Sequence, residues 1–193
     1  MSATFDLDLD PEILAAARRG ERAGQAAIYR QFERAAYGLA RRMSQCPDTA
    51  SDILQNSFLR AFRVLDQFRG EAPFGHWLRR IVATEALTQL REQRRWRELF
   101  VPEAVEDCTV GVEDVSQVDL ERALALLPPV PRSVLWLYHV EGYTHAEIAE
   151  ASGKTASFSK SQLARAHQKL RELLRVTPLS GTAAGGPTLM EVA

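Results

Sequence analysis

GYTHAEIAEASGKTASFSKSQLARAHQKL, residues 142–170, has the most specific local pattern in this chain of 193 residues. Thr144 and Glu147 stand three positions apart before an apolar pair, which predicts a capping box at the start of a helix. Gly153 predicts a tight turn after that helix, and a long basic helix is expected over residues 156–175. A capped helix, a glycine turn and a longer helix together predict a helix-turn-helix.

The start of the long basic helix carries side chains that suit DNA. They are Lys160, Ser161, Gln162 and Arg165. A helix-turn-helix places its second helix in the major groove, where Gln pairs with adenine and Arg or Lys with guanine or phosphate. The alternative is a solvated basic face on a plain helical bundle.

Helical periodicity continues outward from this motif. Apolar residues recur at steps of three or four over residues 28–43, 53–65 and 77–90, and no stretch shows sustained strand alternation. A helix is expected to begin near residue 48, and the glycines and proline of residues 70–75 mark a loop between two helices. The expected fold class is therefore all-α.

The formal net charge of −1 hides a strong segregation of charge along the chain. Residues 60–97 carry nine arginines against four acidic residues, a net charge of +5. Residues 152–175 carry six basic residues against one acidic residue, again +5. Residues 98–121 hold eight acidic residues and no basic one. Two basic segments flanking an acidic one favour a nucleic-acid partner.

This pattern predicts two small helical domains, residues 8–97 and 118–176. Weak periodicity and many acidic residues predict that residues 98–117 form a flexible acidic linker between them. Residues 177–193 are rich in glycine and small residues, so we expect a disordered tail there.

The composition excludes several classes of protein. No run of apolar residues is long enough for a membrane span, and the acidic N-terminus lacks the apolar segment of a signal peptide. Cys46 and Cys108 are too few for a four-ligand zinc site or a disulfide framework, which favours the cytoplasm. The sequence has no phosphate-binding loop, metalloprotease motif or Cys/His cluster. We therefore expect no enzymatic activity, no cofactor and no metal.

Residues 52–91 resemble the second conserved domain of the extracytoplasmic-function (ECF) sigma factors of bacterial RNA polymerase. The matching signatures are Asp52-x-x-Gln55-x-x-Phe58, Phe68-Arg69-Gly70 and Phe74-x-x-Trp77-Leu78-x-x-Ile81. Residues 126–149, which include Glu141-Gly142-Tyr143-Thr144, are similar to the fourth domain of the same family. The ordered pair of domains is more specific than either motif alone.

This resemblance implies that the helix around Asp52 docks on the clamp helices of the largest subunit of core RNA polymerase. The residues expected to dock are Asp48, Ser51, Asp52, Gln55 and Asn56. Carboxylates and amides suit a surface rich in arginine, because charge-assisted hydrogen bonds fix the register. The alternative for Asp52 is an acidic residue that only favours the helix dipole.

The resemblance also implies promoter DNA as a partner. The basic helix would bind the −35 duplex, and residues 68–84 would bind the −10 element and capture an unstacked base in the loop 69–74. The expected −10 contacts are Phe68, Arg69, Phe74, His76, Arg80 and Thr84. The alternatives are that the aromatic residues belong to the core and that His76 is merely exposed.

Three departures from the family pattern bear on regulation and specificity. Ser51 stands where the family has Glu, and phosphorylation of Ser51 or Thr49 would restore about −1.5 to −2 charges. The hypothesis is activation by a Ser/Thr kinase, as in kinase-linked members; the alternative is an unregulated side chain. Thr84 replaces the usual Asn, Thr88 the usual Asp and Gln162 the usual Arg, which shifts the expected promoter preference.

Three functions remain open from the sequence. The first is an alternative sigma factor, controlled by a kinase or an anti-sigma factor, whose acidic linker lies in the RNA-exit path. The second is a stand-alone helix-turn-helix transcriptional regulator, and the third is a protein scaffold that binds no DNA. The helix with Asp52 and Gln55 favours the first, because a simple repressor has no use for it.

Overall fold

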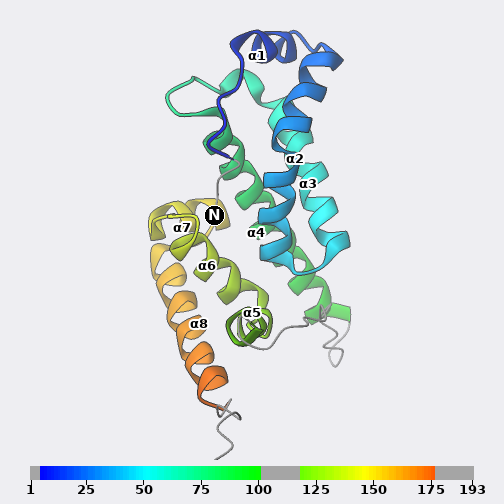
Figure 1. Cartoon of the computed structure of the whole chain (residues 1–193). Helices are drawn as coiled ribbons and strands as arrows, with labels where there is room; N and C mark the ends of the chain where they lie inside the picture. The colour runs from blue at the N-terminus through cyan, green and yellow to red at the C-terminus, as the bar shows by residue number, and fades with distance from the viewer. Residues whose placement is uncertain (1–4, 101–117, 177–193) are drawn as a thin grey trace, which may run out of the picture.

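The computed structural model describes residues 5–100 and 118–176, and both ranges are built from helices (Figure 1). The first range contains α1 (Pro11–Arg18), α2 (Arg22–Ser44), α3 (Pro47–Arg63), the short 3₁₀ helix η1 (Leu65–Gln67) and α4 (Phe74–Phe100). The second range contains α5 (Val118–Ala125), α6 (Pro129–His139), α7 (His145–Ser152) and α8 (Ala156–Val176). The predicted all-α class is confirmed.

Prolines and left-handed residues set the ends of these helices. Pro11, Pro47 and Pro129 each occupy the first helical turn, where a proline leaves no hydrogen bond unmade. Pro129 in this position lets α6 begin directly after Pro128. Gln45, with φ 61°, ends α2, and Gly153, with φ 62°, ends α7.

The N-terminal unit is a bundle in which α2 packs against α1, α3 and α4. Its core includes Phe32, Ile53 and Leu78, all fully buried. Phe5, which precedes α1, also enters this core and is only 4% exposed. The backbone of Phe5 lies so close to Gly75 that a Cβ at Gly75 would stand 1.9 Å from the Phe5 carbonyl oxygen.

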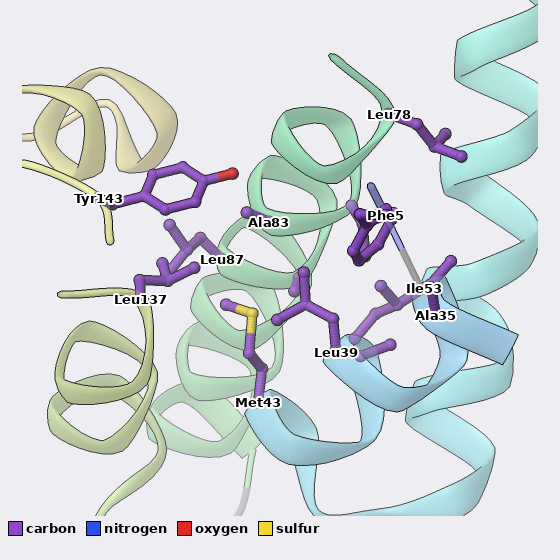
Figure 2. Close-up of a cluster of buried hydrophobic side chains, with 14 of the residues drawn as sticks. Phe5, Ala35, Leu39, Met43, Ile53, Leu78, Ala83, Leu87, Leu137 and Tyr143 are labelled. Atoms are coloured by element: carbon purple, nitrogen blue, oxygen red, sulfur yellow. The ribbon is translucent and has the colours of Figure 1, made fainter. Parts of the chain in front are cut away.

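The two units pack against each other through a shared apolar core (Figure 2). Met43 of α2 and Leu87 of α4 lie close to Leu137 of α6 and Tyr143, and all four are buried. Arg132, 4% exposed, adds a bond across the same contact, since its guanidinium donates to the Met43 carbonyl oxygen at 3.2 Å. The sequence pattern predicted two domains and did not predict this packing.

The segments between and after the two units bear on the domain predictions. α4 continues to Phe100 and so includes the first three residues of the expected linker. The rest of the expected linker, residues 101–117, and the expected tail, residues 177–193, lie outside the described residues. Within the described ranges, no helix is both long enough and apolar enough to cross a membrane.

Candidate nucleic-acid and polymerase interfaces

The helix-turn-helix forms as its sequence predicts. The Glu147 amide donates to the Thr144 hydroxyl at 3.2 Å, and the Thr144 amide donates to the Glu147 carboxylate at 2.9 Å. His145, at the start of α7, is within 2.9 Å of the Ser159 hydroxyl on α8, and its ring stacks on Tyr138 at 4.5 Å. The contact between His145 and Ser159 joins the two helices of the motif.

Three of the four predicted −35 contacts lie on one exposed face of α8. Lys160, Ser161 and Arg165 are exposed; Ser161 and Arg165, four positions apart, are neighbours on the helix surface, and Lys160 precedes Ser161. Gln162 lies on the other side of the helix beside Leu163 and is 7% exposed. In this arrangement its amide does not belong to the exposed basic face, and base contact by Gln162 stays a prediction.

Removing the Thr144 hydroxyl is expected to lower the free energy of unfolding by about 1 kcal/mol at pH 7, because the cap is lost. The amide and hydroxyl of Thr144 hold the pKa of Glu147 below its ordinary value. A carboxylate with a lowered pKa stabilises the fold above its unfolded pKa and loses that effect as the pH falls.

The difference in free energy of unfolding between wild type and Thr144→Ala should therefore become smaller below about pH 4, near the ordinary pKa of Glu. Urea unfolding at both pH values measures it. Ser157→Ala, at an exposed position of α8, is the control. If Thr144→Ala lowered the free energy of unfolding equally at both pH values, the Glu147 carboxylate would not contribute to the cap as we infer.

The predicted docking residues form one continuous face of α3. Asp48, Ser51, Asp52, Gln55 and Asn56 are all exposed. Their spacing of three, four, seven and eight positions from Asp48 is that of neighbours on a helix surface. The structure therefore brings together the whole docking set that the sequence predicts.

Two further features of α3 were not predicted. Leu59 continues the docking face by one turn and is 55% exposed, a large apolar side chain left in water. The sequence could have indicated this position, because Leu59 follows Gln55 by four residues, the same spacing that relates other members of the docking face. Thr49 instead points inward: it is 8% exposed, and its hydroxyl accepts a hydrogen bond from Gln93 at 3.1 Å.

The predicted −10 aromatic residues lie in the core. Phe68 and Phe74 are 8% and 3% exposed, and they pack with Phe32 and Trp77 at ring-centroid distances of 5.3 to 5.5 Å. Their burial agrees with the core alternative. Direct contact of Phe68 and Phe74 with DNA bases stays a prediction.

The polar −10 residues lie on or near the surface around the start of α4. Arg69 is 82% exposed in its side chain, 3.9 Å from Glu71 in the same loop. His76 is 2.8 Å from the Asp6 carboxylate, and Arg80 is 3.5 Å from Glu150. Half-buried Thr84 donates through its hydroxyl to the Arg80 carbonyl oxygen at 2.8 Å.

Comparison with known proteins agrees with this arrangement. The model of sigma-70 region 2 matches residues 28–96, and the model of sigma-70 region 4 matches residues 117–170. The ECF RNA polymerase sigma factor SigM of Mycobacterium tuberculosis is 33% identical over 167 residues, which cover 86% of this chain and 84% of that protein. The chain belongs to the ECF RNA polymerase sigma factors.

Other relatives are consistent with this family. The RNA polymerase sigma factor SigV of Bacillus subtilis is 30% identical over 145 residues, 75% of this chain and 87% of that protein. The fold resembles that of the sigma factor RpoE bound to the anti-sigma factor NepR from Bartonella quintana. That match has a TM-score of 0.56 and 23% identity, and covers 79% of this chain and 98% of the other.

Membership of the ECF sigma factors decides between the three functions that the sequence left open. As such a factor, the chain directs RNA polymerase to promoters and acts in transcription initiation rather than as an enzyme. A stand-alone regulator has no need of a region 2, and a scaffold has no need of the region 4 helix-turn-helix.

Proposed function

We propose that this sigma factor docks on the clamp helices of core RNA polymerase through the exposed face of α3 and acts in the cytoplasm. The observation that carries the proposal is the gathering of the five docking residues on one helix face. Their carboxylates and amides are hydrogen-bond acceptors and donors for an arginine-rich partner, and Leu59 adds apolar area beside them.

Promoter contact is assigned to two surfaces. Lys160, Ser161 and Arg165 on α8 bind the −35 duplex, and Arg69, His76, Arg80 and Thr84 bind the −10 strand. The exposed position of Arg69 and of the α8 set supports this assignment, because phosphates and base edges must reach them. The acidic linker of residues 98–117 is assigned to the RNA-exit path of polymerase, from its charge alone.

Co-elution tests this function directly. The chain is mixed with core polymerase and passed through a sizing column with and without a labelled promoter fragment. We expect it to elute with polymerase alone and to retain the fragment only in the presence of polymerase. Retention of the fragment without polymerase, and no binding to polymerase, would favour a stand-alone regulator.

Regulation is proposed to act on the docking face through Ser51. Ser51 is exposed and its hydroxyl donates to the Pro47 carbonyl oxygen at 3.0 Å, so a kinase can reach it. Thr49 is buried, and a phosphate there would have to enter the contact with Gln93. The structure therefore favours Ser51 over Thr49 as the site, within the hypothesis of activation by a Ser/Thr kinase.

Ser51→Glu is expected to raise transcription by core polymerase several-fold, because it restores a negative charge to the docking face. Thr49→Glu is expected to destabilise the fold instead, since it buries a carboxylate. The measurements are in vitro transcription and urea unfolding, with Ser51→Ala as the control. A wild type that is already fully active and unchanged by Ser51→Glu would contradict the kinase hypothesis.

An anti-sigma factor is proposed as a second kind of partner. Two solved structures of similar fold are complexes: RpoE is bound to the anti-sigma factor NepR, and CnrH is bound to the cytosolic domain of CnrY. The CnrH match has a TM-score of 0.51 and 23% identity, and covers 86% of this chain and 97% of the other. This likeness of fold supports the proposal.

A further inference from the structure

The first turns of α4 carry three basic side chains that each meet a carboxylate from a distant part of the chain. We call His76, Arg79 and Arg80 the basic set, and Asp6, Glu141 and Glu150 the acidic set. The pairs are His76–Asp6 at 2.8 Å, Arg79–Glu141 at 3.5 Å and Arg80–Glu150 at 3.5 Å. The basic set spans positions i, i+3 and i+4 of one helix, so its side chains share one face.

Two of the three carboxylates come from the helix-turn-helix unit. Glu141 precedes α7 and Glu150 lies within it, and α7 packs directly against α4 (Figure 1). Asp6 comes from the N-terminal segment that inserts Phe5 into the core. Acidic side chains of region 4 and of the N-terminal segment therefore contact the basic set at the start of α4.

The three pairs differ in strength. Arg79 and Glu141 are 22% and 3% exposed in their side chains, so their attraction is weakly screened by water. The Tyr143 ring lies 5.4 Å below the Arg79 guanidinium, and the Trp136 indole donates to Glu141 at 3.2 Å. The other two pairs are mostly exposed and contribute little by themselves. Glu141 is therefore the main anchor.

The same contact contains groups that are not satisfied. The Tyr143 hydroxyl and the Nε of Arg79 are buried and have no hydrogen-bond partner among the described residues. Burial raises the pKa of Tyr143 to about 12, so its hydroxyl stays a neutral donor without an acceptor. Unsatisfied buried groups cost free energy and recover their hydrogen bonds in water. Charge pairs therefore add to the apolar core and to the Arg132 bond in holding the two units together, and the unsatisfied groups lower the free-energy cost of opening this part of the contact.

We propose that the acidic set takes the place of promoter phosphates, so that the closed arrangement of the two units and binding of −10 DNA exclude each other. This inference rests on the proposed −10 DNA-binding role of His76 and Arg80, and it extends that role to Arg79 on the same helix face. Carboxylates and phosphates compete for the same basic side chains, and DNA binds only the open fraction of the protein. The apparent affinity for DNA is reduced by that fraction.

The double variant Glu141→Gln/Glu150→Gln tests this inference. Its affinity for fluorescein-labelled oligo(dT) is measured by anisotropy, and its radius of gyration by small-angle X-ray scattering. We expect binding to tighten by about five- to tenfold, the size of a typical coupling between two sites, together with an increase in radius. An unchanged affinity would overturn the inference.

A charge-matched control separates this effect from net charge. Glu21→Gln/Glu172→Gln also removes two acidic residues from exposed ion pairs, Arg19–Glu21 and Lys169–Glu172, which lie within a single unit. We expect no increase in radius and at most a small change in affinity. Equal tightening in this control would show that net charge alone is responsible, and it would overturn the inference.

A second variant covers the case in which loss of the buried Glu141 carboxylate impairs folding. Asp6→Asn/Glu150→Gln changes two side chains that are 65% and 75% exposed, so the fold should tolerate it. Circular dichroism confirms the fold, and a smaller gain in affinity, about twofold, is expected because these pairs are weaker. If the affinity for DNA did not increase in this variant, the pairs formed by Asp6 and Glu150 would not contribute to the exclusion of DNA.

Binding to core polymerase through α3 is measured on the same proteins. If the wild type did not bind core polymerase, the proposed function as a whole would be contradicted. If the variants bound polymerase but showed no increase in affinity for DNA, the closed arrangement and DNA binding would not exclude each other. The docking proposal would be unaffected by that result.

Discussion

Replacing Arg132 by methionine is expected to lower the free energy of unfolding by about 3 to 5 kcal/mol, the range for breaking a buried charged network. Arg132 is 4% exposed, and its guanidinium donates to the carbonyl oxygens of Ala125, Leu127 and Met43 at 3.3, 3.0 and 3.2 Å. Methionine fills a similar volume but donates no hydrogen bond, so carbonyl oxygens are left unsatisfied in the interior.

Because these carbonyl groups come from both units, the substitution should destabilise the whole fold. Ala125 is the last residue of α5 and Leu127 lies in the turn before α6, whereas Met43 belongs to the last turn of α2. One side chain therefore fixes a turn within region 4 and links it to region 2. Urea unfolding followed by circular dichroism measures the effect.

Arg122→Met is the matched control, because it removes the same side chain from an exposed position of α5. The free energy of unfolding of this variant should stay within about 0.5 kcal/mol of the wild-type value. A loss of less than about 1 kcal/mol for Arg132→Met would contradict the role assigned to its hydrogen bonds.

Asp52→Lys is expected to weaken binding to core polymerase by more than about tenfold, because it places a positive charge against the arginine-rich partner that we propose. Asp52 is exposed, and its carboxylate accepts a long hydrogen bond from Gln89 at 3.5 Å. The fold should therefore survive the change. Affinity is measured with labelled core polymerase, and folding by circular dichroism.

Glu172→Lys gives the same change of charge at an exposed site of α8, away from the docking face. Its affinity for polymerase should stay near that of the wild type. Equal loss in both variants would point to a general charge effect, and unchanged affinity in Asp52→Lys would contradict docking through α3.

Local patterns in the sequence predicted the helices and their exposed faces well. The capping box at Thr144 and Glu147 depends on residues three positions apart, so a short stretch contains all the information needed. The docking face of α3 follows from helical spacing in the same way. The burial of Thr49 between exposed Asp48 and Ser51 was not predicted, although it follows from the same spacing, because neighbouring residues point to different sides of a helix.

Contacts between distant residues could not be predicted. The pattern assigned Gly75 to a loop, but it lies in the first turn of α4, where the backbone of Phe5 leaves no space for a side chain. Phe68 and Phe74 suited base stacking and core packing equally well by residue type, and only the structure shows their rings in one cluster. The bonds of Arg132 to α2 likewise need the folded arrangement.

The most direct test of the account is run-off transcription with purified core polymerase and this chain on a library of promoter fragments. We expect specific transcripts that need the chain, that are strongly reduced by Asp52→Lys and that persist with Glu172→Lys. Transcripts of equal yield with Asp52→Lys, or no dependence on the chain in either its Ser51 or its Ser51→Glu form, would contradict it.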